Sequence, residues 1–175
     1  GASGYIGSRI VEDLLDQGYQ VHACVRDASN SKKVNHLIEL GKKSSESDVS
    51  LFEGDLFEKG SYDDAFSGCV AVIHAGATVG FNRETPQEVY DGCFTENEHV
   101  IESVKKSGSV KRFVFTSSFA AVAHPRPEGY VFDEKDWCGD NVEAYKGAWT
   151  EDNISKNRDI AYAMAKANTE KMIYK

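Results

Sequence analysis

Proline and positive charge are both scarce in this sequence. Only 3 of its 175 residues are proline, and 20 lysines and arginines stand against 28 aspartates and glutamates, which gives a formal net charge of −8. With 41% hydrophobic and 11% aromatic residues, the composition predicts a folded chain with a real core. The acidic balance disfavours nucleic acid as a partner, although a small anionic ligand needs only local positive charge.

Paired cysteines and long apolar runs are missing as well. The four cysteines form no Cys-x-x-Cys pair, which argues against a zinc site or a disulfide framework and is typical of thiols in a reducing compartment. No apolar run approaches the length of a membrane span, and no signal peptide opens the chain. We therefore expect a cytoplasmic protein with no metal and no membrane partner. Whether it is a monomer or a homodimer stays open.

Helical and strand periodicities alternate along the chain. Helices are expected at 5–18 (ended by Gly18), 31–43, 61–68 (capped by Ser61), 85–107 and 157–175, and strands at 19–25, 48–55, 69–77 and 112–118. The strand at 69–77 is nearly all apolar, which is typical of a strand covered on both faces. Residues 119–150 are expected to form a long functional loop.

This alternation predicts an α/β fold, a doubly wound parallel sheet with helices on both faces. Residues 1–175 would form one dinucleotide-binding domain. The sequence opens inside a glycine turn and ends inside a helical stretch. We therefore expect that the first strand of the sheet and a C-terminal substrate lobe lie outside it. Ligands of such folds bind beyond the carboxyl ends of the strands.

The opening segment "GASGYIG" has glycines at every third position and leads into a helix. Glycines at this place let the backbone approach a pyrophosphate, whose charge then meets the helix N-terminus. A tight turn with no ligand would show the same spacing. The helix and strand that follow it favour dinucleotide binding.

Two later strand ends carry residues that suit the adenosine half of such a ligand. Arg26 in "CVRD" and Lys33 on the next helix suit a 2′-phosphate, which favours NADP over NAD, although Arg26 could instead pair with Asp27. Asp55 in "EGDL" would accept a hydrogen bond from adenine or merely cap the next segment.

The last two strand ends are "VIHAGAT" and "FTSSF". The small residues 75–77 permit close backbone approach, and His74 is better explained by packing than by catalysis, since no acidic residue adjoins it. A hydroxyl of 116–118 would donate to a substrate carbonyl or satisfy strand-end backbone groups. Further on, "AYAMAK" places Tyr162 and Lys166 one helical turn apart, a spacing that alone does not separate a catalytic pair from two neighbours.

Taken together and in this order, these motifs resemble the extended short-chain dehydrogenase/reductase family, of the NAD(P)-dependent epimerase/dehydratase type with a Rossmann fold. The stretches "VRDASNSKKVNHL", "GDLFEKGSYDDAFSGC" and "VKRFVFTSS" are similar to its dihydroflavonol-4-reductase-like branch. That branch also contains cinnamoyl-CoA reductases and microbial aldehyde and ketone reductases.

The resemblance implies roles position by position. Ser118 would be the oxyanion donor, Tyr162 the proton donor, and Lys166 the partner of the tyrosine as well as a ribose contact. Cofactor contacts are implied for Gly1, Gly4, Tyr5, Ile6, Gly7, Arg26, Lys33, Asp55, Leu56, Ala75, Gly76 and Ala77. Two departures stand out. Ala123 replaces a substrate-orienting asparagine of flavonoid reductases, and "FTENEHVIES" lacks the usual glycine-threonine pair, so that Asn97 is given no role.

These observations predict an NADPH-dependent reductase that acts on a small ketone or aldehyde. Two kinds of alternative stay open. One is another enzyme on the same scaffold, either a nucleotide-sugar epimerase or dehydratase or a relative of 3-beta-hydroxysteroid dehydrogenase. The other is a sensor that binds NADP without turnover, which an altered tyrosine or lysine would have favoured.

Overall fold

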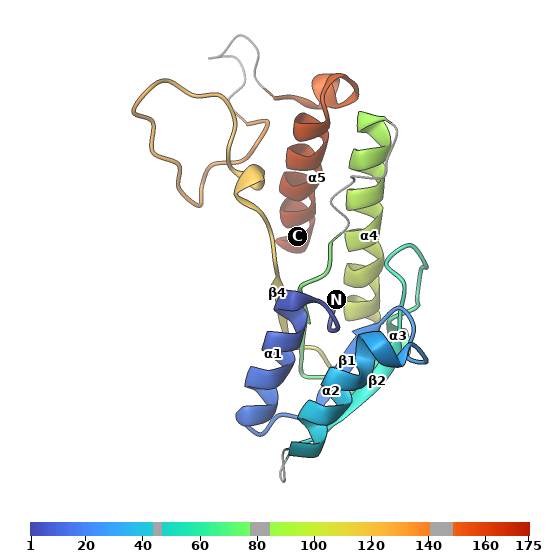
Figure 1. Cartoon of the computed structure of the whole chain (residues 1–175). Coiled ribbons are helices and arrows are strands. Elements are labelled where there is room, and N and C mark those ends of the chain that lie inside the picture. Colours follow the sequence, from blue (N-terminus) through green and yellow to red (C-terminus); the bar gives the residue numbers. More distant parts are fainter. Residues whose placement is uncertain (44–46, 78–84, 141–148) are drawn as a thin grey trace. The chain divides into compact units, whose positions relative to one another are not determined.

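The structure is a computed structural model that describes residues 1–43, 47–77, 85–140 and 149–175. Its chain divides into two compact units (Figure 1). The first unit contains residues 1–77 and 99–116. The second contains residues 78–98 and 117–175. Each unit is considered by itself, within the described ranges.

The alternation of helices and strands expected from the sequence is confirmed. The elements in chain order are α1 (Tyr5–Asp16), β1 (Val21–Val25), α2 (Ser31–Lys43), β2 (Val49–Glu53), α3 (Asp63–Phe66), β3 (Ala71–His74), α4 (Pro86–Ser107), β4 (Arg112–Phe115), the 3-10 helices η1 (Phe119–Ala121) and η3 (Glu151–Lys156), and α5 (Arg158–Ile173). Gly18 follows α1 at φ 83°, a left-handed conformation that glycine adopts without strain, so the predicted end of this helix is correct. Of the loop expected at 119–150, residues 141–148 lie outside the described residues.

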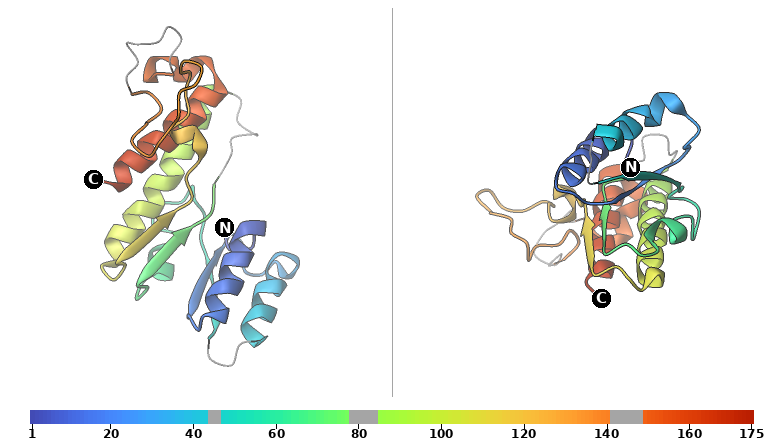
Figure 2. Two further views of the ribbon diagram at one scale, coloured as in Figure 1. Left: turned by 90° about the vertical axis from the view of Figure 1, so that its left-hand side faces the viewer. Right: turned by 90° about the horizontal axis from the view of Figure 1, so that it is seen from below.

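Parallel pairing, which the alternation also predicted, holds for both strand pairs of the first unit. β1 pairs with β2 in the register Val21↔Val49, and β3 pairs with β4 in the register Ala71↔Arg112. The two pairs are visible as arrows in Figure 2. Within the described residues they form two separate two-stranded sheets.

The β1–β2 pair is covered on both faces, because alternate side chains enter two different cores. Residues 21, 23 and 25 of β1 face α1 and α2, in a cluster completed by Val11, Leu15, Val34 and Leu37. The intervening Cys24, with Phe52 of β2, packs instead against a cluster of Tyr62, Phe66, Val72 and Val100. This arrangement fits the doubly wound fold.

β3 departs from the expectation of a strand buried on both faces. Val72 and His74 are buried, whereas Ile73 is 38% exposed and its partner Val114 on β4 is 46% exposed. An apolar run records the hydrophobicity of the side chains and not which element covers each face, and this is why the expectation was wrong for the described structure.

A cavity of about 390 Å³ lies inside the first unit between β1 and β3. Residues 21–24 and 71–74 line it, together with apolar side chains of α1, Tyr62 and Phe66. The strand that the sequence leads us to expect before Gly1 stays a prediction.

We expect Leu37→Ala to lower the free energy of unfolding by about 2–5 kcal/mol, because Leu37 is fully buried between α2 and β1. The matched control is Ile38→Ala on the same helix, where the side chain is 36% exposed and the expected loss is roughly 0.5 kcal/mol. Urea denaturation of the full-length variants measures both. Equal losses would contradict the assignment of the α2 face.

Candidate active site

The glycine turn is built by close backbone contacts that exclude side chains. The amide of Gly4 donates to the carbonyl of Gly1 at 3.1 Å, and α1 starts at the next residue. A Cβ atom on Gly7 would lie 2.1 Å from the Gly1 oxygen, and a Cβ on Gly1 would lie 2.9 Å from the amide nitrogen of Gly76. The turn and the "HAGA" segment are therefore brought together, as the sequence predicted.

The side chains of the turn leave the start of α1 accessible. Tyr5 is 89% exposed and Ile6 is 57% exposed. The amide of Ala2 donates to the carbonyl of Cys24, which anchors the turn at the carboxyl end of β1. An open turn of glycines before a helix N-terminus suits an anionic group, because the first-turn amides of a helix carry partial positive charge.

Arg26 and Lys33 add positive charge beyond the carboxyl end of β1, where both are exposed. The alternative of an Arg26–Asp27 pair is weakened, because the Asp27 carboxylate accepts hydrogen bonds from the amide and hydroxyl of Ser29 and from the amide of Asn30. The Ser29 hydrogen bonds lower the pKa of Asp27, and the charge of Lys33 contributes further. The charge of Lys33 therefore reaches Asp27, the residue that follows Arg26.

The turn after β2 is held by its own hydrogen bonds. Asp55 Oδ1 accepts from the Phe57 amide at 2.9 Å, which supports the reading that Asp55 caps the next segment. The Leu56 carbonyl accepts from Nδ1 of His99 at 3.0 Å. Ser61 was expected to cap α3, but its hydroxyl donates to the Asp55 carbonyl at 2.7 Å, and the α3 N-cap is Tyr62. The serine satisfies the β2 turn in place of the helix.

His74 is a packing residue. It is 8% exposed, and its ring stacks on Phe113 and Phe115 with centroid distances of 6.5 and 5.8 Å. This agrees with the interpretation preferred from the sequence.

The second unit holds the tyrosine and the lysine of "AYAMAK". Asn157 caps α5 by accepting from the Asp159 amide at 2.7 Å. Nζ of Lys166 lies 5.9 Å from the centre of the Tyr162 ring, and Lys166 as a whole is only 2% exposed. The two side chains therefore share one environment on one face of α5.

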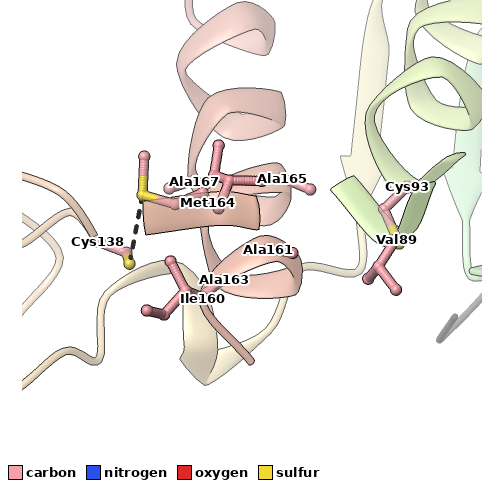
Figure 3. Packing of buried hydrophobic residues seen from close by; sticks show 10 residues of the cluster. Val89, Cys93, Cys138, Ile160, Ala161, Ala163, Met164, Ala165 and Ala167 are labelled. Atoms are coloured by element: carbon pink, nitrogen blue, oxygen red, sulfur yellow. Dashed lines mark hydrogen bonds between the residues drawn. The ribbon is translucent and has the colours of Figure 1, made fainter. Parts of the chain in front are cut away.

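Alanines explain how α5 can be so deeply enclosed. Ala161, Ala163, Ala165 and Ala167 are fully buried, and they pack in one cluster with Val89 and Cys93 of α4 (Figure 3). Small side chains bring neighbouring backbones close, so that Lys166 is shut off from water. This burial lowers the pKa of the Lys166 ammonium, while nearby Cys93, Glu96 and Glu170 act in the opposite direction.

Ser118 belongs to the same unit as Tyr162 and Lys166. It caps η1, with its hydroxyl oxygen accepting from the Ala120 amide at 3.2 Å. Ala120 in turn packs against the α5 cluster. The structure thus gathers the three expected catalytic residues in the second unit and the expected cofactor contacts, Lys166 aside, in the first. It does not by itself test their roles.

One residue beside this group was missed from the sequence. Glu96 is 1% exposed in α4, and its charge acts on Lys166. The signal was present: Val89, Cys93, Glu96 and Val100 follow helical spacing, and all four are buried. A carboxylate at an apolar-face position should have been singled out.

Two kinds of structure are absent from the described residues. No group of three or more histidine, cysteine or acidic residues there is arranged to hold a metal ion. None of the described helices combines the length and the apolar character needed to cross a bilayer.

These observations define the class of an α/β nucleotide-binding protein with a tyrosine–lysine pair. Residues 1–174 match the NAD dependent epimerase/dehydratase family. The chain therefore belongs to that family, and within it to the dihydroflavonol-reductase-like branch of the extended short-chain dehydrogenases/reductases.

The relatives that this chain matches are longer than the chain itself. Dihydroflavonol 4-reductase of Solanum lycopersicum is 40% identical over 138 residues, which are 78% of this chain and 36% of the tomato protein. Cinnamoyl-CoA reductase CAD2 of Medicago truncatula is 36% identical over 178 residues, covering 99% of this chain and 54% of that protein. The chain thus spans between about a third and about half of these relatives.

Solved structures of the same fold agree. Vestitone reductase from alfalfa, Medicago sativa, superposes with a TM-score of 0.68 at 26% identity, over 99% of this chain and 49% of its own. Yeast methylglyoxal/isovaleraldehyde reductase in complex with NADPH gives a TM-score of 0.76 at 23% identity, over 99% and 50%. The second match bears on the fold alone.

We expect Gly7→Ala to weaken NADPH binding and to lower the melting temperature, because its Cβ would collide with the backbone of Gly1. Gly68→Ala is a useful contrast, since Gly68 has open space around its Cβ position and only its φ of 75° opposes the change. Gly68→Ala should cost some stability and leave NADPH affinity unchanged. Calorimetric titration of NADPH and thermal melts measure both effects. Unchanged affinity in Gly7→Ala would contradict the role of the turn.

Proposed function

We propose that this protein is an NADPH-dependent reductase of a ketone or an aldehyde, with Ser118, Tyr162 and Lys166 as its catalytic residues. The observation that carries the proposal is the buried lysine beside the tyrosine on α5: Lys166 is 2% exposed as a residue, and its Nζ lies 5.9 Å from the centre of the Tyr162 ring. An enclosed charge of this kind is costly to maintain and is typical of functional sites.

The first unit supplies the residues that would hold the cofactor. The glycine turn and the start of α1 suit the pyrophosphate, residues 75–77 permit close approach of a nicotinamide ribose, and Arg26 with Lys33 suits a 2′-phosphate. The tight fit of Gly1 and Gly7 supports this assignment, because a Cβ atom on either residue would overlap with neighbouring backbone atoms. When bound, NADPH supplies a hydride.

The second unit supplies the proton and the oxyanion contact. Negative charge develops on the carbonyl oxygen during reduction, and a hydroxyl such as that of Ser118 stabilises it by donating a hydrogen bond. Tyr162 delivers the proton. The nearby Lys166 ammonium stabilises the negative charge that develops on the phenol oxygen as it gives up that proton.

The names of relatives support the substrate class. Dihydroflavonol, cinnamoyl-CoA, vestitone and methylglyoxal reductases all lie on this scaffold. We propose a small carbonyl compound as the substrate of this chain. Ala123, in place of the asparagine of flavonoid reductases, favours a substrate other than a flavonoid.

For the cofactor, we expect full-length protein to bind NADPH more tightly than NADH, and Arg26→Asp to narrow or reverse that preference by removing a phosphate partner and adding repulsion. The matched control is Arg112→Asp, an exposed arginine at the opposite, amino end of β4 that makes the same change in net charge. Fluorescence titration of both cofactors gives the affinities. Equal affinities in the unmodified protein would remove the NADP assignment.

For catalysis, we expect Tyr162→Phe to reduce kcat by roughly 10² to 10⁴ with NADPH affinity nearly intact, because only the proton donor is lost. Lys166→Ala should impair both kcat and NADPH binding, and Ser118→Ala mainly kcat. Tyr174→Phe, at the end of α5 and 78% exposed, is the control and should be neutral. A screen of carbonyl compounds followed by NADPH absorbance provides the substrate. Wild-type turnover in Tyr162→Phe would refute the mechanism.

A further inference from the structure

The buried face of α4 contains a carboxylate where its neighbours are apolar. Val89, Cys93 and Val100 are each at most 4% exposed, and Glu96 lies in the same stripe at 1%. Val89 and Cys93 pack in the same cluster as the alanines of α5. Glu96 stands one turn beyond Cys93, so it lies on the side of α4 that faces α5.

An enclosed carboxylate needs a compensating charge or hydrogen bonds, since removal from water costs several kcal/mol for an ion. Lys166 of α5 is equally enclosed and carries the opposite charge. Val89 and Cys93 pack in one cluster with the alanines on either side of Lys166, so both charged groups belong to the packed face between α4 and α5. The charge of Glu96 also acts to raise the pKa of Lys166. Both residues belong to the second unit, so the pair is defined within one compact body.

We propose that Glu96 is a positioning residue that keeps the Lys166 ammonium protonated and oriented toward Tyr162. The proposal rests on the proposed catalytic role of Tyr162 and Lys166, and it adds a fourth residue to that group. Glu96 acts through Lys166 and need not touch substrate or cofactor.

The other groups around Lys166 are less suited to this role. Cys93, on the same face of α4, influences Lys166 only when its thiol is ionised. Glu170 is on α5 itself, one turn after Lys166, and it is half-exposed, so water screens its charge. Tyr162 is neutral in the form that donates a proton. Glu96 is the carboxylate that combines near-complete burial with an effect on Lys166.

The expected direction follows from the sign of the charges. Burial lowers the Lys166 pKa, and the Glu96 carboxylate partly restores it. Without that carboxylate the ammonium loses its proton at a lower pH, and from that pH upward Tyr162 must donate its proton without a positive charge beside it. The defect should therefore grow as pH rises and nearly vanish in mild acid, where Lys166 is protonated in every variant.

The test is the pH profile of kcat in full-length Glu96→Gln, which keeps size and shape and removes the charge. We expect the alkaline limb to move down by about one pH unit, which is a roughly tenfold loss of kcat above the limb, with kcat at pH 6 within about twofold of the unmodified enzyme. The matched control is Glu98→Gln, two residues along the same helix and half-exposed, which should leave the profile unchanged.

Further variants distinguish a failure of the inference about Glu96 from a failure of the proposed function. Glu96→Asp retains the charge at a greater distance, and its limb should move in the same direction by less. It also replaces Glu96→Gln if the latter does not fold. If Tyr162→Phe and Lys166→Ala abolish turnover but the alkaline limbs of Glu96→Gln and Glu96→Asp coincide with that of Glu98→Gln, the inference about Glu96 is overturned and the proposed function stands. If Tyr162→Phe and Lys166→Ala retain turnover, the proposed function itself fails.

Discussion

The proposed site in the second unit depends on the burial of one charged side chain, that of Lys166. Lys166 sits on an alanine-rich helix that packs too closely for water to reach its side chain. In a low-dielectric environment a charge is expensive by itself and strong in its action on neighbours. In the function proposed above, this charge acts on the phenol of Tyr162, and its proposed partner is the carboxylate of Glu96.

In the first unit the constraint is the short distance between two backbone segments, the glycine turn at 1–7 and the segment at 75–77. A methyl group on Gly1 would overlap with main-chain atoms of the segment at 75–77, and one on Gly7 would overlap with the main chain of Gly1 inside the turn. Such an approach leaves amide groups, not side chains, to face a ligand. The charges that accompany it, Arg26 and Lys33, lie at the exposed end of β1. Close packing therefore requires glycine in the first unit, where backbone segments approach each other, and alanine in the second, where α5 packs around Lys166.

Much of this was predictable from the sequence, and the errors have physical causes. Periodicity predicted the α-helices and strands of the described residues, because each buries one face or alternates, but it did not predict the short 3-10 helices η1 and η3. The prediction that Ser61 caps α3 was wrong, because a serine before a short helix can hydrogen-bond a neighbouring turn as readily as it can cap the helix. The exposure of Ile73 was missed because the hydrophobicity of a strand does not show which element, if any, covers each of its faces. Glu96 was missed because a helix so rich in polar residues conceals which of them face inward. The placement of Ser118, Tyr162 and Lys166 in one unit was predictable only from their resemblance to a family, since the tyrosine follows the serine by 44 positions along the sequence.

The central claim is that Lys166 acts through Tyr162, and a double-mutant cycle on these two residues tests it most directly. The measurement is kcat at saturating NADPH for full-length Tyr162→Phe, Lys166→Ala and the double variant. The account predicts that the double variant loses little more kcat than Tyr162→Phe alone, because the ammonium has no proton donor left to assist. Losses that multiply in the double variant would contradict it.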